Sequence, residues 1–448
     1  MGKYFGTDGF RGLAGVELSA LHAFSIGSFL AHYLKKTSPS PRVVIGKDTR
    51  RSSYMLEYAL ASGLASFGAD AYMLHVTTTP SVSFVCSSEA FDLGIMISAS
   101  HNPYYDNGIK ILNSRGEKID EELTSKIEEF LDSDVRLPAL SGKELGKILD
   151  HSAGRNRYIG YLISTSPYSF KGKRVGLDLS NGGAFMIARV VFEALGASVF
   201  VMGAEPNGTN INEGVGSTHI DALCSFVLEN KLDVGFAFDG DADRCIAVDE
   251  NGQIINGDYI LYILANQLKK QGELKGNKIV TTIMSSSTLT NSLKEKGIHT
   301  LSTKVGDKYV YECMQKNDLS LGGEESGHII LSKYATTGDG ILTSIKLMES
   351  MISEKCPLSY LVRDFSPCPR VCVSVRLEGK TFDFSSLEPL NLHLTDKSLG
   401  YIDTYLGDYR ALVRKSGTEP VVRVLVEGQD KEKCIAYANQ ISEVIKNA

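Results

Sequence analysis

The feature that most constrains the fold is an alternation of short apolar runs with amphipathic helical segments. The apolar runs, four to seven residues long, are expected to be strands: 42–46, 70–76, 93–97, 173–179, 199–202, 232–238, 278–283, 299–302 and 319–322. The helical segments are 52–67, 81–87, 184–195, 220–228, 288–296 and 306–315. Apolar strands separated by helices are typical of parallel sheets covered on both faces. Because the alternation restarts about every 100 residues, it predicts three similar α/β domains with mixed, mostly parallel sheets.

The C-terminal segment has a different pattern. Residues 370–377 alternate like a half-exposed strand, 409–414 and 421–426 are further strands, and 431–446 is a helix, which favours a smaller α+β domain. A chain of 448 residues is also too long for one hydrophobic core. We predict four domains, with boundaries at 1–152, 153–254, 255–366 and 367–448.

Composition and charge disfavour several classes of protein. The formal net charge is −6 with both signs scattered along the chain, whereas a nucleic-acid binder needs a basic face. No apolar stretch reaches the roughly 18 residues of a membrane helix, and residues 1–9 resemble no signal sequence. The eight cysteines contain no Cys-x-x-Cys pair, which favours reduced thiols over disulfides or zinc. We expect a cytoplasmic protein with no nucleic-acid or membrane partner.

An acidic loop follows the apolar strand 232–238. Its sequence, Asp-Gly-Asp-Ala-Asp-Arg at 239–244, places the carboxylates of Asp239, Asp241 and Asp243 two residues apart. Ligands of open parallel sheets bind beyond the carboxyl ends of the strands. Three carboxylates that converge there, with further positions open, suit one Mg²⁺ ion.

The acidic loop has two alternative interpretations. An EF-hand also begins Asp-x-Asp-x-Asp, and Glu250 falls at its twelfth position, but Arg244 stands sixth, where the turn needs glycine, and a strand precedes the loop. A solvated acidic turn would leave three close carboxylates repelling one another. Metal binding is therefore favoured.

A serine motif follows the apolar strand 93–97 in the same way. Its sequence is Ser-Ala-Ser-His-Asn-Pro at 98–103, and Asn-Pro forces a turn. Ser100 could simply cap backbone amides; beside a metal loop it becomes a candidate nucleophile or phosphoryl carrier. A phosphoserine adds about −1.5 to −2 charges and therefore needs basic neighbours. The nearest candidates by motif are Arg11, Lys110, Arg244 and His101.

Two further motifs could bind a sugar phosphate. In the glycine-rich segment 322–328, Glu324 and Ser326 offer an acceptor and a donor suited to adjacent sugar hydroxyls. A glycine-rich turn with only a structural role is the alternative interpretation of this segment. The segment 414–420, with Arg423 after it, combines two hydroxyls, a glycine and a guanidinium in an anion cradle. It lacks the nucleotide P-loop pattern, so phosphate without a nucleotide is expected; an exposed basic hairpin is the alternative.

These four motifs, in their order along the chain, resemble those of the α-D-phosphohexomutase superfamily. The segments Lys-Tyr-Phe-Gly-Thr-Asp-Gly-Phe-Arg-Gly at 3–12 and Ser-Ala-Ser-His-Asn-Pro-Tyr-Tyr-Asp-Asn-Gly-Ile-Lys at 98–110 are most similar to the branch of bacterial phosphoglucosamine mutases. Two positions depart from that branch: Ala242 stands where glycine is common, and Lys415 where proline is frequent. Neither is a proposed ligand.

The resemblance implies four domains around a central cleft, the last one TATA-box-binding-protein-like. It implies an isomerase that interconverts glucosamine 6-phosphate and glucosamine 1-phosphate through phosphoserine and a bound sugar 1,6-bisphosphate, on the route to UDP-N-acetylglucosamine and peptidoglycan precursors. The alternative within the superfamily is a phosphomannomutase/phosphoglucomutase of broader specificity. A monomer or a homodimer is expected.

The resemblance also implies roles for individual residues. Ser100 would be the phosphoserine, and Asp239, Asp241 and Asp243 would bind one Mg²⁺ together with its phosphate. Glu324 and Ser326 would hold sugar hydroxyls. The phosphate that is not transferred would be gripped by Arg414, Ser416, Gly417, Thr418 and Arg423. Residues near the transferring phosphoryl group, or in proton transfer, would be Arg11, Lys110, His101, Arg244 and His328.

Two other classes of function were considered. A metal-dependent phosphatase with an aspartate nucleophile usually needs Asp-x-Asp-x-Thr/Val, and neither Asp239-x-Asp241 nor Asp241-x-Asp243 is followed by Thr or Val at that position. A non-catalytic sugar-phosphate sensor would not need the full set of metal, carrier and cradle residues.

Overall fold

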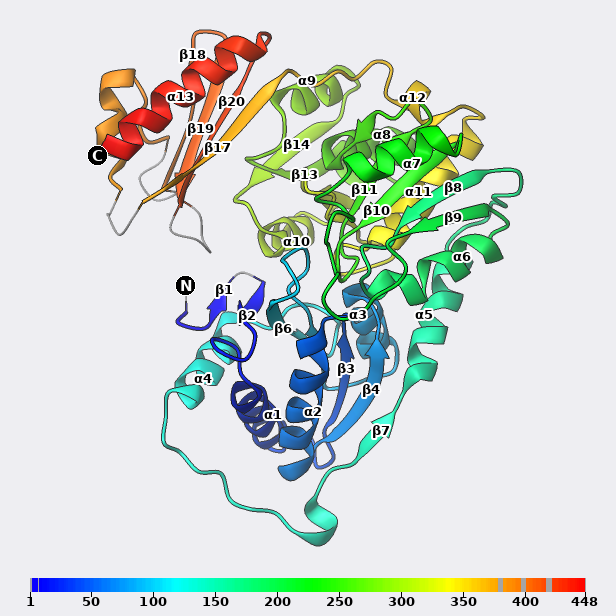
Figure 1. Ribbon diagram of the computed structural model, residues 1–448, viewed down its shortest axis with the longest axis vertical. Coiled ribbons are helices and arrows are strands. Elements are labelled where there is room, and N and C mark those ends of the chain that lie inside the picture. Colours follow the sequence, from blue (N-terminus) through cyan, green and yellow to red (C-terminus); the bar gives the residue numbers. More distant parts are fainter. Residues whose placement is uncertain (1, 7, 378–381, 396–399, 416–420, 448) are drawn as a thin grey trace. The chain divides into compact units, whose positions relative to one another are not determined.

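The structure, a computed structural model, describes residues 2–6, 8–377, 382–395, 400–415 and 421–447 (Figure 1). The chain divides into two compact units. The larger unit contains Gly2–Ser285 and Thr290–Phe365, and the smaller contains Ser286–Leu289 and Ser366–Ala448. Within the described residues, no helix combines the length and the hydropathy that a membrane crossing requires.

The first sheet of the larger unit has seven strands in the order β1-β2-β6-β5-β3-β4-β7. Their bounds are β1 (Phe5–Gly6), β2 (Gly9–Leu13), β3 (Arg42–Lys47), β4 (Asp70–Val76), β5 (Leu93–Ile97), β6 (Asp106–Asn113) and β7 (Ile148–Asp150). Strand β3 pairs in parallel with β4 and β5, and β6 returns antiparallel to β5.

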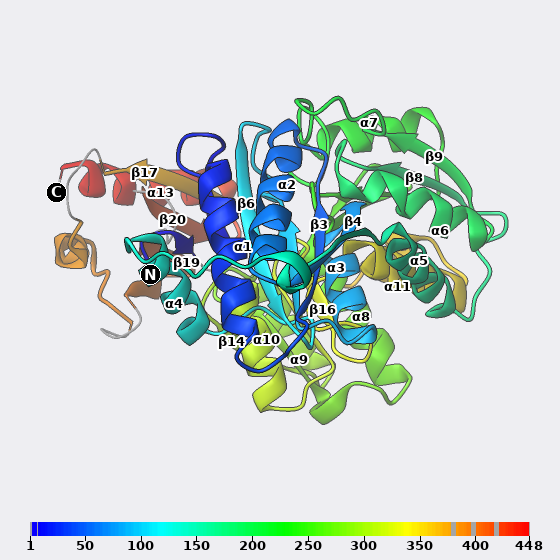
Figure 2. The ribbon, with the colours of Figure 1, turned by 90° about the horizontal axis from the view of Figure 1, so that it is seen from below.

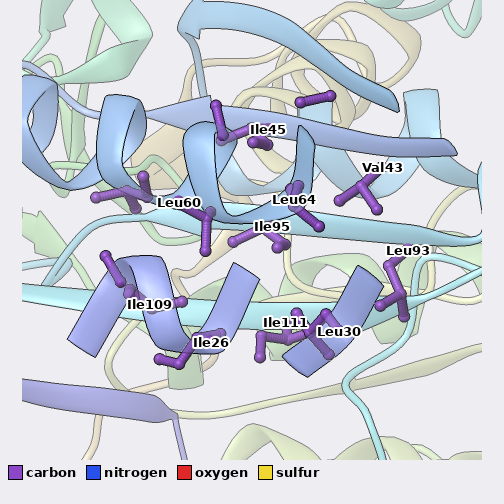
Figure 3. Close-up of a cluster of buried hydrophobic side chains, with 14 of the residues drawn as sticks. Ile26, Leu30, Val43, Ile45, Leu60, Leu64, Leu93, Ile95, Ile109 and Ile111 are labelled. Carbon is purple, nitrogen blue, oxygen red and sulfur yellow. The ribbon is translucent and has the colours of Figure 1, made fainter. Parts of the chain in front are cut away.

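Helices cover both faces of this sheet. Helices α1 (Ala20–Leu34) and α2 (Arg51–Ser66) lie side by side on one face, where Val43 and Ile45 of β3 enter their core (Figures 2 and 3). The intervening Val44 points the other way, into a separate core with α3 (Thr79–Ser88). Since successive side chains of a strand face opposite sides, an unbroken apolar run can fill both cores.

The second and third sheets repeat part of this topology. The second has the order β12-β11-β10-β8-β9 and the third β14-β13-β15-β16. Their bounds are β8 (Arg174–Asp178), β9 (Ser198–Met202), β10 (Val234–Phe238), β11 (Cys245–Asp249), β12 (Ile254–Ile255), β13 (Lys278–Thr282), β14 (His299–Thr303), β15 (Leu321–Gly323) and β16 (Ile329–Leu331). All three sheets share one plan, in which three parallel strands are followed by an antiparallel return strand. The strands follow this plan in the orders β4-β3-β5-β6, β9-β8-β10-β11 and β14-β13-β15-β16. The three similar α/β domains predicted from the sequence are confirmed.

The return strand places the three functional motifs at equivalent points. The serine loop (98–105) joins β5 to β6, the acidic loop (239–244) joins β10 to β11, and residues 324–328 join β15 to β16. The strands before these loops were predicted, whereas the return strands were not. A hairpin return has no intervening helix, so the strand–helix alternation used for the prediction gives no signal for it.

The remaining helices of the chain include several that the sequence analysis missed. Their bounds are α4 (Glu121–Leu131), α5 (Ser152–Ser164), α6 (Ala188–Ala194), α7 (Asp221–Glu229), α8 (Gly257–Lys270), α9 (Ser287–Glu295), α10 (Asp307–Lys316), α11 (Gly340–Ser353) and α12 (Leu358–Leu361). Helices α1, α4, α5, α8, α11 and α12 were not predicted. Helix α11 is buried along most of its length, and polar residues such as Thr343 and Ser350 are buried with its apolar ones, so no exposed polar face marks it as a surface helix.

The smaller unit contains an antiparallel sheet of order β17-β20-β19-β18 with helix α13 packed on it (Figure 1). The bounds are β17 (Arg370–Arg376), β18 (Tyr401–Leu406), β19 (Tyr409–Lys415), β20 (Val421–Glu427) and α13 (Lys431–Asn447). Val424 and Val426 of β20 face Ala438 and Ile441 of α13 in one core. The predicted C-terminal α+β domain is confirmed.

One buried carboxyl in the larger unit predicts a pH-dependent stability. Asp339 caps α11 by accepting from the Leu342 amide (2.9 Å) and also accepts from the Tyr158 hydroxyl (2.7 Å). Burial raises the pKa of Asp339 from 3.8 to about 6, although both hydrogen bonds oppose the shift. The folded state therefore binds the proton more tightly, and this contribution to stability is lost as the pH rises from about 4 through about 6. Asp339→Asn should remove up to about 3 kcal/mol of that pH dependence.

The measurement is urea unfolding of both proteins across pH 4 to 7. Asparagine retains the acceptor for Leu342, so the helix cap should persist in the variant. The difference in unfolding free energy between the two proteins should change across this interval and be constant above it. Parallel curves would show that Asp339 titrates normally in the folded protein.

Candidate functional site

Ser100 lies buried at the first turn of the serine loop. Its φ is +53°, in the left-handed region, and its side chain is 1% exposed. The hydroxyl Oγ donates to Oδ2 of Asp239 at 2.5 Å and lies 3.3 Å from Nδ1 of His101. The serine predicted as a carrier therefore contacts the acidic loop directly.

The acidic loop gathers three buried carboxylates. Asp239, Asp241 and Asp243 each offer an oxygen atom, and these atoms lie within 4.8 Å of one another. Burial, followed by the charges of Asp243 and Asp241, raises the pKa of Asp239 well above its ordinary value. Such mutual repulsion would be relieved by a cation held between the carboxylates.

Lys110 supplies positive charge to this cluster from strand β6. Its Nζ lies 2.7 Å from Oδ2 of Asp241, 3.1 Å from Oδ2 of Asp243 and 3.2 Å from Oδ2 of Asp8. Burial opposes the charge of the ammonium, but these three carboxylates raise the pKa of Lys110 well above its ordinary value. In return Lys110 is the main cause of a lowered pKa at Asp243, against the effect of burial.

Arg244 and His101 flank Ser100. The Arg244 amide donates to Oδ1 of Asp239 (3.1 Å), and its Nη1 lies 3.2 Å from Nδ1 of His101. Burial, and then the positive charges of Arg244 and Arg11, lower the pKa of His101 to about 3. The ring is therefore neutral near pH 7, with Nδ1 as an acceptor for the guanidinium and the proton on Nε2.

The glycine-rich segment adjoins the acidic loop. The Cys245 amide donates to the Gly327 carbonyl (3.0 Å), immediately after the acidic loop ends. Glu324 accepts from the Gly306 amide (3.0 Å), and the buried Oγ of Ser326 has no hydrogen-bond partner among the described residues. Both predicted sugar ligands therefore lie beside the carboxylate cluster, and Ser326 retains a free hydroxyl.

His328 links this segment to the acidic loop. Its Nδ1 lies 3.6 Å from Oδ1 of Asp243, and Nε2 lies 2.9 Å from the Gly338 amide nitrogen. Burial opposes a charge on the ring, but the nearby Asp243 carboxylate, and then the charge of Asp307, raise the pKa of His328 to about 9. An Nε2 that accepts from Gly338 requires the neutral ring. A cation on the aspartates would offset their charge and favour that neutral form.

The residues of the predicted phosphate cradle belong to the smaller unit. Arg414 on β19 and Arg423 on β20 are direct register partners, so two guanidinium side chains occupy adjacent positions. Ser416, Gly417 and Thr418 lie outside the described residues. Paired arginines on neighbouring strands suit an anion such as a phosphate.

Comparisons with known proteins assign the family. Models of the phosphoglucomutase/phosphomannomutase family match four successive parts of the chain: α/β/α domain I at residues 2–136, domain II at 156–252, domain III at 256–368 and the C-terminal domain at 400–444. The chain is 53% identical over 451 residues to a phosphoglucosamine mutase of Lachnospira eligens, covering 100% of this chain and 99% of that protein. It is 44% identical over 450 residues to the phosphoglucosamine mutase of Bacillus subtilis, with the same coverage.

The chain belongs to the phosphohexomutase superfamily. Solved structures agree with this at the level of the fold. A phosphoglucomutase/phosphomannomutase family protein from Burkholderia thailandensis superposes with a TM-score of 0.83 at 24% identity, covering 100% of this chain and 98% of that one. Aspergillus fumigatus N-acetylphosphoglucosamine mutase, in complex with GlcNAc-6P and magnesium, gives 0.66 at 14% identity, covering 100% and 96%.

Each of the four matched parts of this phosphohexomutase contains one of the predicted motifs. The serine loop lies in domain I, the acidic loop in domain II, the glycine-rich segment in domain III, and Arg414 and Arg423 in the C-terminal domain. The enzyme is thus an isomerase of the mutase type.

The acidic loop of this phosphohexomutase fits Mg²⁺. Oδ1 of Asp241 and Oδ1 of Asp243 are buried yet accept no hydrogen bond from the described residues. Their other oxygens already accept from Lys110. Two carboxylate oxygens without hydrogen-bond partners thus lie beside Asp239, whose pKa is raised. Such hard, anionic oxygen atoms are the ligands that Mg²⁺ prefers.

Three charged residues of the site were missed from the sequence. Lys118 bridges Asp8 (2.6 Å) and Asp307 (2.7 Å), and Asp307 lies 3.7 Å from Nε2 of His328. Arg11, which was predicted, pairs with the same Asp8. Asp8 lies within the recognised segment 3–12 and Lys118 lies shortly after the segment 98–110, but Asp307 begins α10 far from any of the motifs. Only the tertiary fold brings Asp307 to the site.

Proposed function

We propose that this phosphohexomutase is a phosphoglucosamine mutase, which interconverts glucosamine 6-phosphate and glucosamine 1-phosphate in the cytoplasm. The observation that supports it most is the 2.5 Å contact between Ser100 Oγ and Asp239, inside a cluster of carboxylates suited to Mg²⁺. The amino-sugar substrate is favoured because full-length relatives at 44% to 53% identity are phosphoglucosamine mutases.

The proposed carrier is Ser100 in its phosphorylated form. In the first transfer, the bond between phosphorus and Ser100 Oγ breaks and a bond to the free sugar oxygen forms, which gives a 1,6-bisphosphate. The sugar hydroxyl gives up its proton, and Ser100 Oγ ends as a hydroxyl. The bisphosphate then turns over, and its other phosphate returns a phosphoryl group to Ser100. Sugar 1,6-bisphosphate would also prime the unphosphorylated enzyme.

The side chains around Ser100 balance the charge of this chemistry. A phosphoserine with the three aspartates would bring a local charge of about −5. Lys110, Arg244 and Arg11 supply three positive charges near the cluster, and His101 remains neutral. Mg²⁺, when bound by Asp239, Asp241 and Asp243, would supply the remaining positive charge and stabilise the transferring phosphoryl group.

The remaining motifs would orient the sugar. Glu324 and Ser326 are placed to bind adjacent hydroxyls, and Ser326 Oγ is available for this bond. Arg414 and Arg423, with Ser416, Gly417 and Thr418, would hold the phosphate that is not being transferred. One fixed phosphate site and a hydroxyl site that accepts two sugar orientations allow both transfers to use the same Ser100.

A substrate panel tests the proposal. With Mg²⁺ and a trace of sugar 1,6-bisphosphate, glucosamine 6-phosphate should be converted with a kcat/KM at least about tenfold above glucose 1-phosphate or mannose 1-phosphate, a difference of about 1.4 kcal/mol. Equal or better turnover of the neutral hexose phosphates would instead indicate a broad phosphomannomutase/phosphoglucomutase. Release of inorganic phosphate without an isomeric product would indicate a phosphatase. The assay should follow both isomers by chromatography or ³¹P NMR.

A further inference from the structure

A fully buried arginine lies behind the serine loop. Arg50, at the N-terminus of α2, has no exposed surface, and its guanidinium uses every N–H group. Nη2 donates to the carbonyls of Ser100 (3.0 Å) and Asn102 (2.8 Å), and Nη1 donates to those of Pro103 and Asp106. The fifth donor, Nε, bonds to Oδ2 of Asp48 (2.8 Å). Four carbonyls of one short loop thus converge on a single planar side chain.

Asp48 connects this arginine to the amide side of Ser100. Besides Arg50, it accepts from the hydroxyl of Ser98 (2.7 Å), and Ser98 Oγ in turn accepts from the Ser100 amide (2.9 Å). Both main-chain polar groups of Ser100 are therefore held by one buried network. This fixes the backbone of a residue that has an unfavourable, left-handed φ.

A residue of the second α/β domain also binds the carbonyls of Ser100 and Asn102. Asn212, from the loop after β9, donates through Nδ2 to the carbonyls of Ser100 (2.9 Å) and Asn102 (3.1 Å). The acidic loop also approaches closely, because a Cβ added to Gly240 would lie 2.6 Å from the Ser100 carbonyl oxygen. The carbonyl of Ser100 is thus tied to both domains that supply the carrier and the metal ligands.

We propose that Asp48, Arg50 and Asn212 are positioning residues for phosphoryl transfer, an inference that rests on the proposed function. None of them contacts Oγ. They direct the carbonyl oxygens of Ser100 and Asn102 toward cationic or amide donors and leave Oγ facing Asp239. Because in-line transfer depends on the placement of one oxygen, a small rotation of this loop lowers the rate without removing any reacting group.

Arg50→Lys and Asn212→Ala test the proposal by separating rate from affinity. Lysine retains the charge but cannot bond four carbonyls at once. We expect kcat to fall by about 10²-fold for Arg50→Lys and by about tenfold for Asn212→Ala, with KM for the sugar phosphate changed little. The direct readout is the rate at which dephosphorylated enzyme acquires one phosphoryl group from sugar 1,6-bisphosphate, followed by rapid quench and intact mass.

A matched control comes from another buried ion pair of the same domain. Lys47 and Glu57 pair with almost no exposure, and among the described residues neither side chain forms a hydrogen bond or ion pair with the serine loop. Glu57→Gln should lower the melting temperature, as Arg50→Lys does, while phosphorylation of Ser100 proceeds at the wild-type rate. If Arg50→Lys fails to fold, Ser98→Ala replaces it, because it cuts the same network without removing a charge.

The outcomes separate this inference from the proposed function. The inference would be overturned if two folded variants turned over at wild-type rates. These are Asn212→Ala and Arg50→Lys, with Ser98→Ala in place of Arg50→Lys if the latter does not fold. An equal loss of rate in Glu57→Gln would also overturn it, since the effect would then follow stability alone. Wild-type enzyme that interconverts no hexose phosphate would instead refute the proposed function, whatever the variants do.

Discussion

Replacement of Ser100 by alanine is expected to reduce mutase turnover by about 10⁴-fold or more, because the covalent carrier is lost. The fold should survive. The variant loses Oγ and its contacts with Asp239 and His101, whereas the main chain of residue 100 remains held by Arg50 and Asn212. The measurements are conversion of glucosamine 6-phosphate, thermal unfolding, and intact mass, which should lack the phosphoryl group expected on the wild-type protein.

The control for this experiment is Ser87→Ala, at an exposed serine on α3 of the same domain. That variant should retain both the activity and the phosphoryl group. Near-wild-type turnover by Ser100→Ala would exclude Ser100 as the carrier. A phosphoryl group that persists on folded Ser100→Ala would place the carrier on another residue.

Removal of Mg²⁺ should have the next largest effect. Chelation is expected to abolish turnover, and Mg²⁺ should restore it. Asp241→Asn should lower kcat by about 10²- to 10³-fold even at saturating Mg²⁺, since it removes a charge from the oxygen cluster. Asp249→Asn is the matched control, because Asp249 lies at the far end of β11 and its Oδ1 already accepts two amides.

The same site predicts how Mg²⁺ affinity varies with pH. Since the pKa of Asp239 is raised by burial and by its neighbours, protons bind the metal-free site more tightly than they bind an ordinary carboxylate and compete with the cation. Apparent Mg²⁺ affinity should therefore increase as the pH rises, and binding should release protons. Titration calorimetry in two buffers of different ionisation enthalpy measures that release. Binding without proton release, or turnover in excess chelator, would contradict this account of the acidic loop.

Much of the fold was predictable because apolar runs identify strands buried on both faces. The strands before the serine and acidic loops, β5 and β10, were located in this way, and the alternation of polar and apolar residues located β17 of the C-terminal domain. Helix α11 was missed because its polar residues are buried with its apolar ones, so no exposed polar face marks it as a surface helix. The return strands β6, β11 and β16 were missed because each follows its partner strand directly in a hairpin, without the intervening helix on which the prediction depended.

Only part of the candidate site was likewise predictable from the sequence. Asp239, Asp241 and Asp243 stand out because three carboxylates in six residues have few structural explanations. Arg50 leaves no comparable signal, because it acts on main-chain carbonyls that every sequence contains. Asp307 likewise stands at an ordinary helix start and acquires its partner Lys118 only from the fold.

The shared strand plan of the three α/β domains has an evolutionary consequence. Duplication of one ancestral unit would yield three hairpins at one topological position, and each could then diverge independently. Here one copy carries the serine, a second the carboxylates, and a third the groups suited to sugar hydroxyls. Under the proposed function, substitutions within residues 324–328 would change the substrate preference, while the copies that contain Ser100 and the acidic loop would keep the chemistry of transfer.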